Sequence, residues 1–195
     1  MKEIFDIQQP TISYCDLKQV YVRVNEEEVQ VEEYDQMEEG GEPTLVTKYQ
    51  YDVVLTTVDC PSEEHVVAKM KELKIADINA YDTSSNVNSF TYHGVEMWLD
   101  KDTRNGLIMR LNAEKAVGKT ETTLWFGTIS FTIGIDDGLQ LLTLLEVYAS
   151  ACYDNTASHI AAVEALNDVE DIFNYDYTVG YPPKIVIEDV VRGIN

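Results

Sequence analysis

The sequence lacks the residue patterns that would assign a chemistry directly. Its 195 residues include only three cysteines and three histidines. No C-x-x-C pair and no H-x₃-H spacing occurs, so no metal site is expected. An odd number of widely spaced cysteines is typical of free thiols in a reducing compartment.

Long apolar runs are also missing. The most apolar stretch, residues 138–152, is shorter than the roughly 18 residues that a membrane-spanning helix needs, and it contains Glu146. The residues after Met1 read KEIFDIQQP and have no apolar segment typical of a signal peptide. We therefore expect neither membrane association nor secretion through a signal peptide.

Positive charge is scarce. The chain has 35 acidic and 14 basic residues, a net charge of −21. Residues 1–64 carry 16 acids and 4 bases, residues 65–127 carry 8 of each, and residues 128–195 carry 11 acids and 2 bases. Without a basic patch, direct binding to nucleic acid is disfavoured. The acidity indicates solubility first, and then docking on a basic partner or mimicry of a nucleic acid.

The N-terminal part, residues 1–60, predicts an acidic, β-rich region. Residues 20–24 and 29–31 alternate apolar and polar side chains, which predicts a hairpin around a turn at residues 25–28. A polar loop is predicted for residues 32–43 and a further strand for residues 48–58. Pro61 then opens a connecting helix within residues 61–80, and its apolar spacing ends before Ala76.

Residues 81–183 predict an α+β domain in the order hairpin, helix, hairpin, helix, helix. The first hairpin turns at His93 and Gly94, where positive φ is favoured. A helix then runs from Asp100 to an exit at Gly118, and a second hairpin is centred on Gly127. Helices follow over residues 138–153 and 157–173. Residues 184–195 form the C-terminal tail, in which residues 184–187 are either a last strand or a linker.

The stretch LEVYASACYDNTASHI, residues 145–160, places a thiol, a carboxylate and an imidazole close together in sequence. Cys152 lies on the apolar stripe of the predicted helix and should face the core, where a thiol is protonated and inert. Asp154 and Thr156 predict a helix break, with His159 starting the next helix. We therefore expect Cys152, Thr156 and His159 to form a structural corner, and no catalytic residue is predicted.

Two further segments resemble binding loops without matching them. Residues 100–106, DKDTRNG, depart from the EF-hand spacing at the fifth position and at the glycine, so helix capping explains the acids. Residues 117–120, VGKT, lack the first glycine of a P-loop and follow a helix. No cofactor is therefore predicted.

Aromatic residues supply the candidate interaction residues. Trp98 and Trp125 lie on the predicted hairpins, where aromatics usually belong to the core. Tyr175, Tyr177 and Tyr181 lie in a loop beside Pro182 and Pro183. Such tyrosines either anchor an interface or fold back onto their own domain.

The order of motifs over residues 81–183 resembles an uncharacterised domain of bacteriophage and prophage proteins that are often encoded near tail and tail-fibre genes. The residues that carry the resemblance are Tyr81-Asp-Thr-Ser84, Val87-Asn-Ser-Phe90, Met97-Trp-Leu-Asp100 with Arg104, Thr123-Leu-Trp-Phe126, Leu145-Glu-Val-Tyr-Ala149, Cys152-Tyr153, Thr156, His159, and Tyr175-Asp-Tyr with Gly180-Tyr-Pro182. The resemblance transfers no catalytic or binding residue.

The resemblance implies a virion-associated structural protein of the tail, baseplate or fibre region. Such a protein acts through contacts with other phage structural proteins, and a homo-oligomer is compatible with it. It would be found in the virion or in the cytoplasm of the bacterial host. The alternatives are a tail-fibre assembly chaperone and an acidic DNA mimic that inhibits a host nucleic-acid-binding protein.

Overall fold

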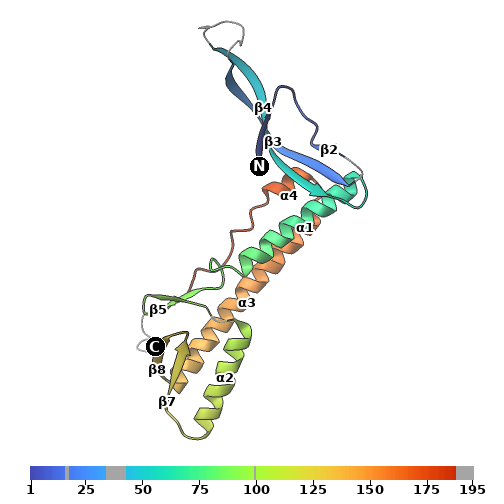
Figure 1. Ribbon diagram of the computed structural model, residues 1–195. Coiled ribbons are helices and arrows are strands. Elements are labelled where there is room, and N and C mark those ends of the chain that lie inside the picture. Colours follow the sequence, from blue (N-terminus) through green and yellow to red (C-terminus); the bar gives the residue numbers. More distant parts are fainter. Residues whose placement is uncertain (16–17, 34–42, 99, 188–195) are drawn as a thin grey trace. The chain divides into compact units, whose positions relative to one another are not determined.

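The computed structural model describes residues 1–15, 18–33, 43–98 and 100–187 (Figure 1). The chain divides into two compact units. Unit 1 comprises residues 1–76 and 161–176, and unit 2 comprises residues 77–160 and 177–195. This division differs from the predicted segments, because the second half of the chain returns to complete the first unit.

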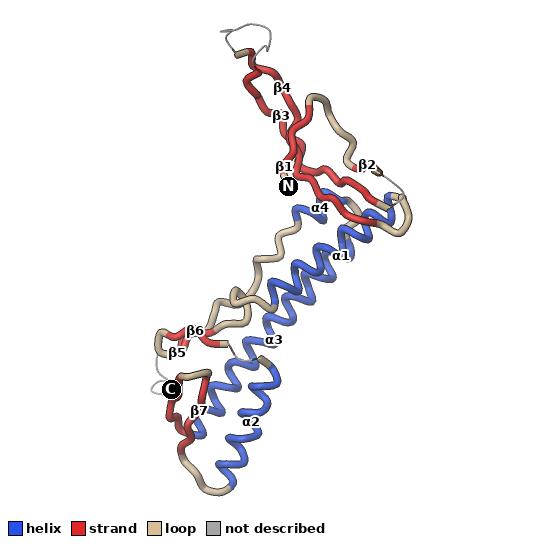
Figure 2. Tube along the Cα trace, in the orientation of Figure 1, coloured by secondary structure: helices blue, strands red, loops and turns tan. Residues whose placement is uncertain are grey.

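Unit 1 is built on a four-stranded antiparallel sheet in the order β1-β4-β3-β2. Its strands are β1 (Lys2–Phe5), β2 (Ile12–Tyr14), β3 (Gln19–Glu33) and β4 (Thr44–Thr57). Strands β3 and β4 run on past β1 and β2 as a two-stranded ribbon, in which residues 29–33 pair with residues 44–48 (Figure 2). The predicted loop at residues 32–43 falls mostly on residues 34–42, which lie outside the described residues.

The hairpin predicted around residues 25–28 is wrong. Residues 19–33 form one strand, and the pairing passes from Val24–Asp52 to Glu27–Gln50, so β3 carries one extra residue at this point. Asn25 takes the positive φ of 56° that this bulge requires. Its side chain donates to Asp52 and to Asn174 rather than closing a tight turn.

One face of this sheet forms the core of unit 1 together with the helices. Val20, Val22 and Val24 are buried on β3, and the short helix α4 (Val169–Asn174) contacts that strand. Asp168 caps α4 by accepting from the N–H groups of residues 170 and 171. Unit 1 therefore has a sheet covered by helical residues.

Unit 2 contains two small sheets and helix α2 (Lys101–Ala116). Strands β5 (Phe90–Tyr92) and β6 (Val95–Met97) form the predicted hairpin, and β9 (Val186–Ile187) adds to β5 in parallel. Strands β7 (Glu121–Phe126) and β8 (Ile129–Gly134) form the second hairpin. The α+β class is confirmed. The hydrophobic core of the unit includes Phe90, Leu111, Leu124, Ile133, Leu142 and Leu145.

Both long helices extend further than the sequence predicts. Helix α1 (Glu63–Asp82) continues beyond residue 76 and buries Ile78. Helix α3 (Ile135–Ala165) is continuous over 31 residues, so the break predicted at residues 154–156 is wrong. The chain leaves the helix only after Ala165. Among the described residues, no helix combines the length and the apolar character that crossing a membrane requires.

Candidate interaction site

The returning C-terminal segment of unit 2 packs its tyrosines on the unit's own helices. The ring of Tyr81, near the end of α1, lies 5.6 Å from that of Tyr177 and 5.5 Å from that of Tyr181. The His159 ring lies 5.8 Å from that of Tyr181. The sequence leaves open whether the tail tyrosines anchor an interface or fold back onto their own domain. Tyr177 and Tyr181 fold back onto their own unit.

A chain of hydrogen bonds explains why Thr156 sits inside α3 instead of ending it. Its hydroxyl oxygen lies 2.7 Å from a carboxylate oxygen of Asp82 and 2.9 Å from the hydroxyl of Tyr181. The carboxylate can only accept, so Thr156 donates to Asp82 and Tyr181 donates to Thr156. Burial raises the pKa of Tyr181, which keeps this donor protonated.

His159, one turn further along α3, binds the same C-terminal segment at Val179. Its Nε2 lies 2.9 Å from the Val179 carbonyl, which can only accept, so Nε2 carries the proton. Asn155 donates to the same carbonyl at 3.1 Å. The imidazole is buried and holds the backbone at Val179 against α3.

Cys152 is buried, with 3% of its surface exposed. Burial raises the pKa of its thiol, and the nearby Asp82 carboxylate raises it further, while a hydrogen bond with Tyr148 partly opposes both effects. His159 lies seven residues along the same helix, a rise of about 10 Å. The thiol and the imidazole thus make separate contacts. Cys152, Thr156 and His159 lie on one continuous helix, so the corner predicted for them is wrong.

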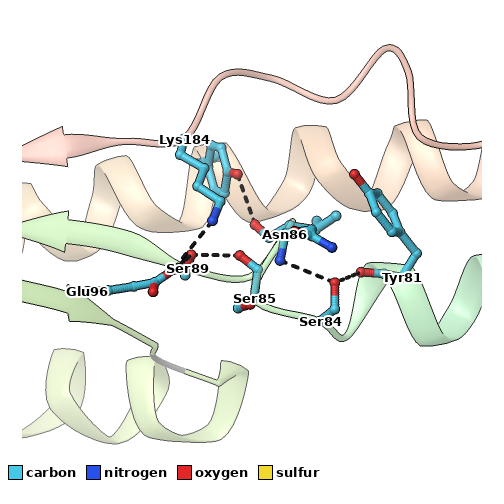
Figure 3. Close-up of polar contacts among 9 residues, drawn as sticks. Tyr81, Ser84, Ser85, Asn86, Ser89, Glu96 and Lys184 are labelled. Carbon is cyan, nitrogen blue, oxygen red and sulfur yellow. Dashed lines mark hydrogen bonds and ion pairs between the residues drawn. The ribbon is translucent and has the colours of Figure 1, made fainter.

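The loop between α1 and β5 is held by side-chain bonds to backbone (Figure 3). The Ser84 hydroxyl donates to the Tyr81 carbonyl at 2.6 Å, and the buried Ser89 hydroxyl lies 2.7 Å from both the Ser85 carbonyl and Glu96. Lys184 reaches Glu96 at 3.4 Å, and hydrogen bonds from Ser89 and Lys184 lower the pKa of that carboxyl. These contacts join the loop, the hairpin and the chain leading to β9.

A cleft of about 490 Å³ opens in unit 2 where α3, the start of α2 and this loop meet. Trp98 and Tyr153 line it, and they are 53% and 69% exposed. Four carboxylates and two bases also line the cleft: Asp82, Asp100, Glu146, Asp154, Lys101 and Arg104. The cleft therefore combines exposed aromatic surface with a carboxylate excess.

The wall of the cleft is fixed by an ion pair and a helix cap. The Arg104 guanidinium is buried and donates to Glu146 across a distance of 2.9 Å. Asp100 accepts from the N–H and the hydroxyl of Thr103 at the start of α2, and these bonds lower the pKa of its carboxyl. The capping role predicted for Asp100 is confirmed. Rigid supports of this kind favour a preformed binding surface.

The remaining predicted interaction residues lie elsewhere. Trp125 is 67% exposed on β7 and is not among the residues that line the cleft. Tyr175 belongs to unit 1, where its carbonyl accepts from Lys74. Sequence reasoning missed Tyr153, although its place off the apolar stripe of α3 marks it as an outward-facing aromatic.

Comparisons with protein-family models, with curated proteins and with solved structures found no match to this chain. Among the residues that the structure describes, no three His, Cys, Asp or Glu side chains lie close enough together to hold a metal ion. The function of the site is therefore inferred from its own residues alone.

Proposed function

We propose that this chain is a virion-associated interaction protein of a phage or prophage, acting in the tail, baseplate or fibre region. The observation that carries this proposal is the cleft of unit 2, in which Trp98 and Tyr153 are exposed beside four carboxylates. Tryptophan and tyrosine are enriched in protein interfaces and supply much of their binding energy. The resemblance over residues 81–183 gives the phage context.

The charge of the site favours a basic segment of a protein partner. The cleft carries two more carboxylates than bases, within a chain of net charge −21. Long-range attraction of this sign accelerates encounter with a basic surface, and aromatic faces hold lysine or arginine side chains by cation–π contact. We place no bond-breaking step at Cys152, because its protonated, buried thiol is a poor nucleophile.

The test is complementation of a phage that lacks this gene with plasmid-borne variants. Trp98→Ala removes the exposed indole and should lower both the yield of infectious particles and the binding of the partner that co-purifies with the wild-type protein. We expect a loss of at least about tenfold in binding, the usual effect of removing an aromatic anchor.

The matched control is Leu144→Ala, which removes an exposed apolar side chain (46% exposed) from a part of α3 that does not line the cleft. This variant should complement like the wild type. Equal complementation by Trp98→Ala and the wild type would contradict the role of the cleft. A protein that is required for assembly but missing from finished particles would instead be a chaperone.

A further inference from the structure

Unit 1 has an open groove of about 830 Å³ along helix α1, and none of the residues that line it lines the cleft of unit 2. Its floor is apolar and consists of Val67, Ala68 and Ile75. We call it the α1 groove. Ala68 is exposed, and Val67 and Ile75 are only half-buried, so this face of α1 keeps apolar surface in contact with solvent.

The rim of the α1 groove is acidic. Glu63, Glu64, Glu72 and Glu164 line it, against one base, Lys71, whose ammonium group donates to the Glu164 carbonyl at 2.7 Å. The groove therefore has a net charge of −3. An apolar floor between carboxylates suits an amphipathic helix that carries basic side chains beside its apolar stripe.

Helix α2 in unit 2 has an outer face with this character. Its inner face buries Arg104 and Leu111, and the opposite face leaves Met109 74% exposed and Val117 77% exposed. We call the exposed, small or apolar positions of that face the α2 outer stripe. The stripe consists of Gly106, Met109, Ala113, Ala116 and Val117.

The charge around the α2 outer stripe is opposite to that of the groove. Residues 101–119 contain five bases and two acids; without Arg104, which is buried on the inner face and paired with Glu146, the segment has a net charge of +2 in a chain that is otherwise strongly acidic. Lys101, Arg110, Lys115 and Lys119 of this segment are exposed. At contact distances such complementary charges outweigh the repulsion between more distant parts, which salt screens beyond about 8 Å.

The dimensions of the two surfaces also agree. Along α1 the groove is lined from Glu63 to Ile75, thirteen residues, and the α2 outer stripe runs from Gly106 to Val117, twelve residues, so each surface is about 16–18 Å long in helical geometry. Small residues on the stripe allow the two helices to approach closely.

We propose that the α1 groove of one copy of this chain receives the α2 outer stripe of a second copy. The two surfaces differ, so the contact is head-to-tail, and repeating it builds a ring or an open chain. This contact is independent of the proposed role in the virion, because purified protein alone is sufficient to form it.

The test compares the mass of the purified full-length protein in solution over a range of concentrations by sedimentation velocity. The wild type should change from one chain to larger species as the concentration rises. Met109→Asp places a carboxylate on the stripe, and the double variant Glu64→Lys, Glu72→Lys reverses the rim. Each should remain at the mass of one chain while keeping the wild-type circular dichroism spectrum and melting temperature to within a few degrees.

Mixing the two variants gives the sharpest result. Each retains one intact surface, so an equimolar mixture should form a species of two chains and nothing larger. Val147→Asp, which alters an exposed valine of α3 (66% exposed), is the control and should associate like the wild type. A wild type that stays at one chain at every concentration overturns the proposal, as does a mixture that fails to form the two-chain species.

Discussion

Cys152 and Cys15 carry the same functional group in different surroundings. Cys15 and Cys60 are exposed, whereas Cys152 faces the interior of unit 2 beside Tyr148, where burial raises the pKa of its thiol. Reaction with a thiol reagent requires the thiolate and access to it. The residue that the sequence brings closest to His159 is therefore the least reactive of the three.

We predict that a chromogenic disulfide reagent at pH 8 modifies two thiols of the native protein rapidly and the third only after unfolding. The thiols that react should be Cys15 and Cys60. In the Cys152→Ser variant the fast reaction should still release two equivalents. Three equally fast thiols in the wild type would contradict the buried position of Cys152.

Among the secondary-structure elements, helix α2 contains a glycine, Gly106, that neither its backbone conformation nor its packing requires. A Cβ atom added at Gly106 would meet no atom within 4 Å, and its φ is not positive. By contrast, a Cβ at Gly138, near the start of α3, would lie 3.0 Å from a methyl carbon of Leu111 in the core. The two glycines therefore respond differently to the same substitution.

We predict that Gly106→Ala raises the free energy of unfolding by about 0.5–1 kcal/mol, because alanine loses less backbone entropy in a helix. Urea denaturation measures the change. Gly138→Ala is the matched comparison and should gain less or lose stability, since Leu111 must shift to admit the methyl group. A destabilised Gly106→Ala protein would contradict the exposed position of this residue.

The errors of the sequence predictions at this scale share one physical cause. The turns at His93-Gly94 and the cap at Asp100 were predicted correctly, because their bonds join residues close in sequence. Asn25 and Thr156 have side chains typical of turns and helix breaks, but their partners are remote. Asn174 lies 149 residues from Asn25, and Asp82 lies 74 residues from Thr156. A local pattern cannot show that such a side chain is already satisfied.

The candidate site was predicted only in part for a related reason. Trp98 was identified from its residue type, but the cleft also depends on Tyr153 and Asp82, which α3 and α1 bring to it. Tyr177 and Tyr181 are of a residue type that is common in interfaces, but they pack against Tyr81 inside unit 2. Composition predicts which residues can bind, whereas the fold decides which of them remain exposed.

For the whole molecule, buried phenols and a buried thiol link stability to alkaline pH. Burial raises the pKa values of Tyr51, Tyr148, Cys152 and Tyr181. The unfolded chain loses these protons first, near the ordinary values of about 8.5 for cysteine and 10 for tyrosine. The folded state then binds more protons than the unfolded state, so the free energy of unfolding falls as pH rises.

We predict that stability, measured by urea denaturation, is lower at pH 10.5 than at pH 8. Tyr148→Phe should show a shallower decrease, because it removes one of the linked groups. It should also lose about 1 kcal/mol at pH 8, because the hydroxyl no longer donates to the Val87 carbonyl. An identical pH dependence in Tyr148→Phe and the wild type would contradict this linkage.

The charge of the whole chain also fits binding to a basic partner. The acidic residues are concentrated in residues 1–64 and 128–195, and the ribbon of β3 and β4 presents two of them, Glu32 and Glu33. Carboxylates along an exposed ribbon oppose pairing with other strand edges. The exposed strand edges of this acidic chain are therefore protected from pairing with the strand edges of other acidic chains, including its own copies.

The most direct test of the proposed function is quantitative mass spectrometry of purified particles of the phage that encodes this chain. We predict that the chain is present in a fixed number of copies per particle, and that this number is maintained after washing in high salt. Its absence from purified particles, with the protein abundant in the infected cell, would contradict a role as a virion component.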